Sequence, residues 1–160
     1  MQTKRRVFLK GGLAASAAGL AVGAGLLSPR AVLAEGHSSE WPESAFGATS
    51  MDDAMNDYFG MTDVSDSDEI TVKAPDIAEN GAVVPVTVES AIADSSKVAI
   101  FVSKNPEPLI ASFDLSGANP FVSTRIRMGE TDDVTGVVSA GGKLYKAGKE
   151  VKVTIGGCGG

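Results

Sequence analysis

The sequence has very few of the residues on which catalysis and metal binding usually depend. It contains one cysteine, Cys158, and one histidine, His37. A single cysteine excludes an intramolecular disulfide, and these two residues do not form a cluster at metal-ligand spacing. No Ser-His-Asp set has a plausible histidine, because we expect His37 to be a solvated residue near the mature N-terminus, and no glycine-rich phosphate loop is present. We therefore expect no catalytic site, no metal and no bound cofactor.

The acidic run at residues 63–69 also lacks the pattern of a cation site. It reads Asp-Val-Ser-Asp-Ser-Asp-Glu, without the fixed glycine turn and the distal glutamate of a Ca²⁺ loop. Serine and aspartate are frequent in turns because their side chains bond to the neighbouring backbone. We interpret the run as a loop.

The first 34 residues are predicted to be an export signal. Arg5 and Arg6 stand directly before Val-Phe-Leu-Lys, and residues 11–27 carry no charge. This pattern resembles a twin-arginine signal, although Lys4 stands where Ser or Thr is commoner. The length of the uncharged run alone would allow a permanent membrane span. However, the run is rich in Gly and Ala and is therefore only weakly hydrophobic for such a span. Residues 32–34, Val-Leu-Ala, place small residues at a cleavage site, so we expect a mature periplasmic protein that begins at Glu35.

Removal of the signal makes the chain strongly acidic. Five of the 14 basic residues and none of the 20 acidic residues lie in residues 1–34. The remaining 9 basic against 20 acidic residues give the mature chain a net charge of −11. That charge disfavours nucleic acid and anionic membranes and favours a partner with a basic face. A role in solubility alone is the alternative, and composition does not separate the two.

Residues 35–69 are predicted to be an N-terminal helical segment and linker. Apolar residues recur at helical spacing and share one face: Met51, Ala54, Met55, Tyr58 and Phe59. Ser50 with Asp53 offers a capping-box-like start, and Gly60 offers a stop. A shorter helical turn is expected around residues 41–46. We expect the apolar face to pack on the sheet edge or the end of its own domain.

From Ile70 the apolar period changes from 3.6 to 2. Seven runs alternate in this way between turn-rich separators, at residues 70–73, 84–88, 98–102, 109–115, 122–128, 134–138 and 151–155. Short strands without interleaved helices predict an all-β fold, an immunoglobulin-like two-sheet β-sandwich over residues 70–155. Pro85 conflicts with a central strand and suggests an edge position or a bulge.

The tail, residues 156–160, places the only cysteine between two glycine pairs. Gly156, Gly157, Gly159 and Gly160 surround Cys158 with residues that have no Cβ and impose little conformational preference. We expect a flexible C-terminal arm with an exposed thiol that sweeps a radius of about 10 Å from Ile155. A buried structural cysteine does not fit this position, and an incidental thiol on a frayed tail is the remaining plain alternative.

Two stretches carry a resemblance to a known family. Residues 76–86, Asp-Ile-Ala-Glu-Asn-Gly-Ala-Val-Val-Pro-Val, follow Ala74-Pro75, and together with the Gly-Gly-Cys-Gly-Gly tail they resemble the SoxY family. That family provides the sulfur-compound carrier of the periplasmic Sox thiosulfate-oxidation system. The resemblance implies a heterodimer with SoxZ and covalent attachment of substrate sulfur to Cys158. It also implies three transient partners: haem-containing SoxAX, which joins thiosulfate oxidatively to the thiol, the SoxB hydrolase, which releases sulfate, and a sulfane dehydrogenase.

Three functional hypotheses follow. The first is a covalent sulfur carrier that is not itself an enzyme. The second is an exported structural or interaction module that dimerises through Cys158. The third is a thiol enzyme such as a peroxidase, which is disfavoured because a catalytic cysteine needs a pre-organised electropositive site. A twin-arginine route carries folded cargo, so the chain is expected to cross the membrane together with its partner.

Overall fold

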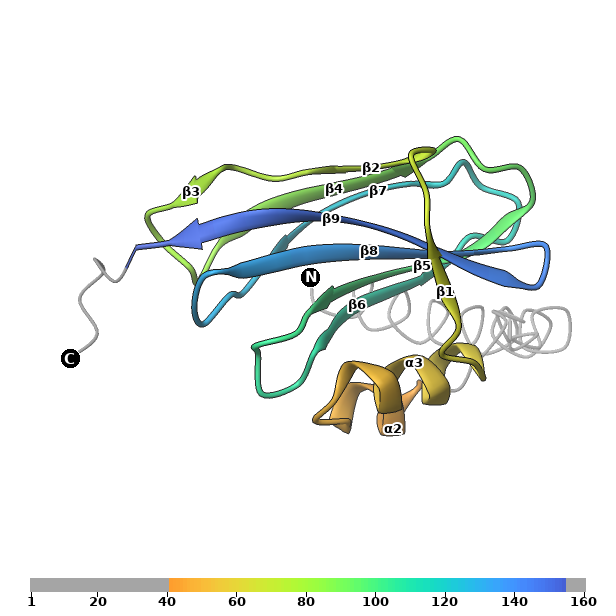
Figure 1. The fold of residues 1–160 in the computed structure, drawn as a ribbon, viewed down its shortest axis with the longest axis horizontal. Helices are drawn as coiled ribbons and strands as arrows, with labels where there is room; N and C mark the ends of the chain where they lie inside the picture. The colour runs from red at the N-terminus through yellow and green to blue at the C-terminus, as the bar shows by residue number, and fades with distance from the viewer. Residues whose placement is uncertain (1–40, 155–160) are drawn as a thin grey trace, which may run out of the picture. The chain divides into compact units, whose positions relative to one another are not determined.

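Two β-sheets and two short helices make up the part of the chain that this computed structural model describes, residues 41–154 (Figure 1). The predicted signal with Arg5 and Arg6, His37, and the tail with Cys158 and its four glycines lie outside these residues. The elements, in chain order, are α2 (Glu43–Gly47), α3 (Met51–Phe59), β1 (Val64–Asp66), β2 (Ile70–Lys73), β3 (Ile77–Ala78), β4 (Val84–Ser90), β5 (Ser95–Val102), β6 (Leu109–Asp114), β7 (Phe121–Ile126), β8 (Asp132–Ala140) and β9 (Lys143–Val153).

The two sheets form the predicted sandwich. The larger sheet has the strand order β1-β9-β8-β5-β6, with β3 also paired with β9, and the smaller sheet has the order β2-β4-β7. Apolar side chains from both sheets meet between them, among them Val86 and Val88 of β4, Ile100 of β5 and Val138 of β8. Their alternation along the strands places every second side chain in one shared core. The immunoglobulin-like architecture expected from the sequence is confirmed.

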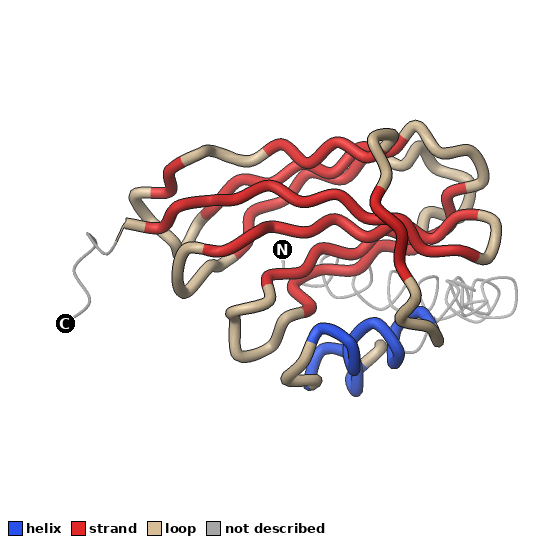
Figure 2. Tube along the Cα trace, in the orientation of Figure 1, coloured by secondary structure: helices blue, strands red, loops and turns tan. Residues whose placement is uncertain are grey.

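The helices, drawn in blue in Figure 2, cover the outer face of the larger sheet, whose strands are red. Ala54, Met55 and Tyr58 of α3 pack in one cluster with Phe101 of β5 and Leu144 of β9. The prediction that this helix face packs on a sheet edge or domain end is therefore wrong. The reason lies in β5, which is apolar on both faces, so its outward side chains need cover as well as its inward ones.

The predicted helix ends are confirmed. Ser50 Oγ accepts a hydrogen bond of 3.1 Å from the Asp53 amide and donates one of 2.6 Å to the Asp53 carboxylate. Gly60 ends α3 with φ 76°, and its amide donates to the Asn56 carbonyl at 2.8 Å. Glycine adopts this left-handed conformation without steric cost. Of the helices within residues 41–154, none is long and apolar enough to cross a bilayer.

Strand β9 is the organising strand of the larger sheet, and it pairs with segments that the sequence did not predict as strands. Residues 63–69 were expected to be a loop, yet Val64–Asp66 form β1, which pairs in parallel with β9. Ile77–Ala78 form β3, also parallel to β9. Strand β9 itself begins at Lys143, eight residues before the predicted run at Val151. Backbone pairing decides these elements, because their side chains lack sustained alternation.

Pro85 lies in the central strand of the smaller sheet, where β4 pairs with β7 without a register shift. The predicted bulge is therefore absent from this pairing. The β2–β4 pairing ends at Lys73 opposite Thr87, so β7 alone pairs with β4 at Pro85. The strand is locally an edge there, which explains why proline, with no amide hydrogen, is tolerated.

Candidate functional site

The described part of the predicted carrier site is the end of β9 (Figure 1). Thr154 is the last described residue. We call the segment Lys152–Thr154 the root. The predicted attachment residue Cys158 and the glycines 156, 157, 159 and 160 lie beyond it, outside the described residues.

One side of the root is held by the strand β3. Ile77 opposes Lys152 and Ala78 opposes Val153 in parallel register. The Lys152 amide donates to the Asp76 carbonyl at 3.0 Å, and the Thr154 amide donates to the Ala78 carbonyl at 3.1 Å. Pairing with β3 therefore continues to the last described residue of the root.

The other side of the root is held by a side chain in place of a strand. The β8–β9 ladder begins at Asp132 opposite Val151, and one residue before β8 stands Thr131. Its Oγ1 accepts a hydrogen bond of 2.9 Å from the Val153 amide, and the hydroxyl lies 3.5 Å from the Val153 carbonyl oxygen, to which it donates. Thr131 thus extends the ladder beyond the strand and keeps the Val153 backbone satisfied where β8 no longer pairs.

A close backbone approach completes the root. The Met128 amide donates to the Gly81 carbonyl at 2.7 Å. A Cβ on Gly81 would lie 2.4 Å from the Met128 carbonyl oxygen and 2.9 Å from Val153 Cγ1. Only glycine fits there without a shift of the backbone. Asn80 sets the turn before it, since its Oδ1 accepts from the Ala82 amide at 3.0 Å.

Residues 76–86, on which the family resemblance rests, therefore form one wall of the root. They contribute the Asp76 and Ala78 carbonyls, the Asn80-Gly81 turn and the start of β4. The Asp76 carboxylate also forms an ion pair of 3.0 Å with Lys149 Nζ on β9. With the carboxylate side chain 88% exposed, this pair contributes little to stability.

The loop between β5 and β6 supports the segment that carries Thr131. Asn105 Nδ2 donates to the Arg127 carbonyl at 2.7 Å, and its Oδ1 accepts from the Gly129 amide at 3.0 Å. Lys104 Nζ donates to the Thr131 carbonyl at 2.8 Å. We call the segments 76–83, 103–105 and 127–131 the rim, because all three surround the root and are hydrogen-bonded to it or to each other.

The rim carries two exposed aliphatic side chains. Ile77 is 58% exposed and Val83 is 51% exposed. Within residues 41–154 no group of three potential metal ligands is found, at the rim or elsewhere. The rim therefore offers contact surface and backbone anchorage, and its described side chains do not form a metal centre.

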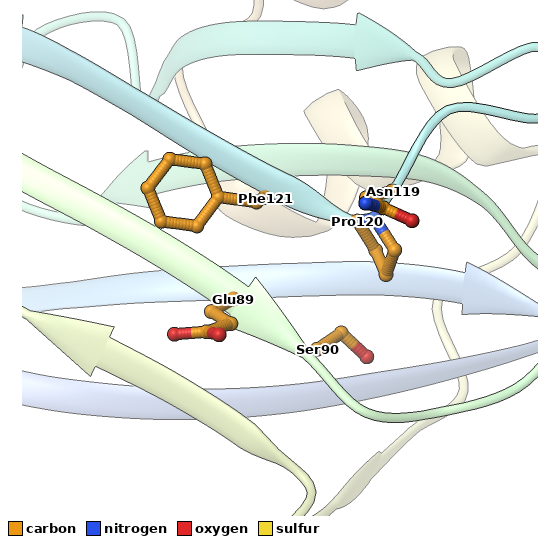
Figure 3. A pocket seen from close by; sticks show the side chains of 5 residues that line it. All are labelled: Glu89, Ser90, Asn119, Pro120 and Phe121. Carbon is orange, nitrogen blue, oxygen red and sulfur yellow. The ribbon is translucent and has the colours of Figure 1, made fainter.

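An open hollow of about 370 Å³ lies at the far end of the smaller sheet from the rim, lined by Glu89, Ser90, Asn119, Pro120 and Phe121 (Figure 3). Glu89 opposes Phe121 at one end of the β4–β7 pairing, whereas Val84 at the other end leads to the rim. Ser90 is engaged in the turn, where its Oγ accepts from the Ile92 amide at 3.1 Å. The side chains in Figure 3 spread along the strand ends and do not converge on one point.

A buried tyrosine lies under α3, remote from the root in the pairing order of the sheet. No group in residues 41–154 meets hydrogen-bond geometry with the Tyr58 hydroxyl, although the Ser112 and Asp114 side chains lie close enough to affect its pKa, and Lys97 Nζ lies 4.7 Å from the ring centroid. Burial, and secondly the negative charge of Asp114, raise the pKa of Tyr58 to about 12. The tyrosine stays neutral over the physiological range, so this group belongs to the helix packing.

Comparison with known proteins decides the family. The sequence profile described as "Sulfur oxidation protein SoxY" matches residues 55–158, a stretch that contains the whole rim and ends at Cys158. The chain belongs to the SoxY family. The structure is similar to that of the sulfur carrier protein SoxY from Chlorobium limicola f thiosulfatophilum, with a TM-score of 0.60 and 50% sequence identity over 65% of this chain and 96% of that chain. No curated protein sequence matches this one.

The SoxY assignment confirms the resemblance drawn from residues 76–86 and the tail. The structure gives those residues a role that the sequence did not reveal, since the sequence places Gly81 only in one of the turn-rich separators between strand runs. Thr131 and Asn105 were missed altogether. A lone threonine before a strand and an asparagine in a loop carry no signal of a partner distant in sequence.

Proposed function

We propose that this SoxY chain is a periplasmic covalent carrier of sulfur intermediates in thiosulfate oxidation. Cys158 is the attachment point, and residues 156–160 act as an arm that presents the bound group to partner enzymes in turn. The observation that carries the proposal is the match to the SoxY family over residues 55–158, which extends to this cysteine. A solved relative described as a sulfur carrier protein supports it.

The chemistry requires a free thiol and outside catalysts. In the first step the Cys158 thiol and thiosulfate form a sulfur–sulfur bond, releasing one proton and two electrons that a haem enzyme accepts. In the second step water cleaves the terminal sulfone, so that sulfate and a proton leave and a persulfide stays on the cysteine. The carrier supplies the attachment atom, the thiolate being the reactive form of cysteine, and acts without catalytic groups of its own.

The geometry of the root supports a carrier with a fixed base. The root amides donate three hydrogen bonds, to the Asp76 carbonyl, the Ala78 carbonyl and Thr131 Oγ1, which hold the chain in place up to Thr154. Cys158 follows four residues later, which limits its reach from Thr154 to about 13–14 Å. The glycines on both sides of the cysteine keep that short stretch narrow.

The proposed partners follow from the SoxY family. SoxZ forms the heterodimer, and SoxAX, the SoxB hydrolase and a sulfane dehydrogenase engage the arm transiently. Arg5 and Arg6 direct export of the folded pair by the twin-arginine route. Replacing both with lysine should leave both subunits in the cytoplasm, and recovery of the partner subunit alone from the periplasm would contradict joint export.

Replacement of Cys158 tests the carrier proposal directly. The Cys158→Ser chain should fold and bind its partner subunit, yet thiosulfate-dependent electron transfer in a reconstituted Sox system should fall to background. Mass spectrometry of the native chain after turnover should find sulfonate or sulfane adducts on Cys158. Activity of the serine variant near that of the native chain would refute the proposal. A Cys158-linked dimer as the sole modified form would favour the interaction module.

A further inference from the structure

The short distance from the root to Cys158 constrains how any enzyme can approach. If Cys158 carries the sulfur group, the reacting atom of a partner enzyme must come within about 13–14 Å, plus the length of the bound group, of Thr154. A channel of that depth brings its mouth against the surface around the root. The rim therefore lies in the contact with an enzyme whose reacting atoms are at that depth.

Two of the exposed side chains of the rim suit an apolar contact. Five large apolar side chains are exposed in residues 41–154, and two of them, Ile77 and Val83, lie on the rim. They stand on either side of the Asn80-Gly81 turn, which is fixed against Met128 and Val153. Both side chains are β-branched and stiff, so little side-chain entropy is lost when a partner covers them.

Three charged residues close to the root, Asp76, Lys104 and Asp132, are engaged within the chain, whereas Glu79, Arg127 and Glu130 of the rim are exposed. The Asp76 carboxylate pairs with Lys149 Nζ at 3.0 Å. Lys104 Nζ donates to the Thr131 carbonyl at 2.8 Å, and the Lys104 amide donates to the Asp132 carboxylate, also at 2.8 Å. A partner gains little from pairing with the engaged groups again, whereas coverage of the two aliphatic side chains removes apolar area from water.

We propose that Ile77 and Val83 are the docking contacts of this carrier for the enzymes that act on its bound sulfur. The partner is an enzyme whose active site lies at the bottom of a narrow channel with an apolar mouth. This inference rests on the carrier function proposed above. Burial of the apolar area of these two side chains stabilises the contact.

The test is steady-state sulfate release from the heterodimer after Cys158 has been loaded with a thiosulfate-derived sulfonate. Ile77→Ser and Val83→Ser are compared singly and together, with the sulfate-releasing hydrolase as the probe enzyme. Each single change should raise KM for the loaded carrier roughly fivefold to tenfold, and the pair by more than roughly tenfold. The value of kcat should change less than about twofold, since neither side chain reaches the reacting atoms.

Phe121→Ser is the matched control. Phe121 is 55% exposed, similar to Ile77 and Val83, but lies at the end of the smaller sheet remote from the rim. Its replacement should leave KM unchanged. Ile77→Thr and Val83→Thr keep β-branching and serve as variants that preserve the strand and turn, with smaller increases in KM of the same sign.

Several outcomes would overturn the docking proposal. They are an unchanged KM in the double variant, an equal rise in Phe121→Ser, or a loss that follows weakened association with the partner subunit. The carrier function fails separately, if the Cys158→Ser chain still accepts and releases the sulfonate. If the Cys158→Ser chain is inactive while the rim variants are fully active, the docking contact is refuted and the carrier function stands.

Discussion

Substitution of Gly81 by alanine tests whether the Gly81–Met128 approach fixes the root. The added Cβ would lie 2.4 Å from the Met128 carbonyl oxygen and 2.9 Å from Val153 Cγ1. The first neighbour is backbone, so relief requires that the turn and the segment before β8 move apart. That movement lengthens or breaks the bond of 2.7 Å from the Met128 amide to the Gly81 carbonyl.

The magnitude follows from two terms. Overpacking by one methyl group at an unyielding position costs about 1–3 kcal/mol. Loss of a backbone hydrogen bond costs about 1 kcal/mol more. We expect Gly81→Ala to lower the free energy of unfolding by about 2–4 kcal/mol, which corresponds to a fall in Tm of roughly 8–16 °C for a domain of this size.

Thermal unfolding of the mature chain, followed by circular dichroism, measures the effect. Gly47→Ala is the matched control, because nothing lies within 4 Å of the position that its methyl group would take and Gly47 ends α2. That change should leave Tm unchanged or raise it slightly. Amide hydrogen exchange should accelerate at Val153 in the Gly81 variant alone. Equal Tm values for the two variants would show that the close approach does not constrain the root.

Three further changes address other parts of the structure. Gly136→Ala should lower the free energy of unfolding, measured by chemical denaturation, by about 1–3 kcal/mol, because the added Cβ would lie 2.9 Å from Val88 Cγ1 between the sheets. An unchanged denaturation midpoint would contradict that packing. Thr131→Val removes the acceptor that lies 2.9 Å from the Val153 amide, so hydrogen exchange at that amide should accelerate and the free energy of unfolding should fall by about 1–2 kcal/mol. Unchanged exchange would show that the hydroxyl is dispensable. The native chain should lose stability between about pH 10 and pH 12, because the pKa of Tyr58 is about 12 in the folded chain and 10.0 ordinarily, so the unfolded chain loses the proton first as pH rises. Tyr58→Phe should abolish this loss. Below pH 10 the same change should be nearly neutral, because the hydroxyl has no partner among the described residues, and a native-like alkaline profile in the variant would refute the assignment.

The fold class was predictable because most strands bury one face. Alternation at residues 84–88 and every second residue of the apolar run 98–102 place valines and Ile100 on the shared core. Such a pattern can be recognised from the side chains alone. The helix α3 was predictable for the same reason, together with its cap at Ser50 and its stop at Gly60. The face that α3 covers was not predictable. The apolar run of β5 is compatible with a helix covering its outer face, and equally with a strand buried between other layers of the fold.

The strands β1 and β3 could not be read from the sequence. They are short, and they exist because β9 offers free backbone hydrogen bonds on the side away from β8. The Ser/Asp-rich run at residues 63–69 favours a turn in isolation, and only the neighbouring strand makes extension of residues 64–66 favourable. The same holds for Lys143–Glu150, where pairing with β8 carries the strand through residues without alternation.

Local sequence was enough to specify the sandwich, the helix ends and the position of the only cysteine four residues beyond Thr154. These features depend on periodicity, backbone propensity and covalent spacing, all of which act between near neighbours in the chain. The anchorage of the root, in contrast, required the chain to fold. Thr131 meets Val153, and Gly81 meets Met128, across 22 and 47 residues of sequence. Such contacts depend on how strands pair in space. Hydrogen bonding between distant backbone groups produces no periodic pattern of side chains in the sequence.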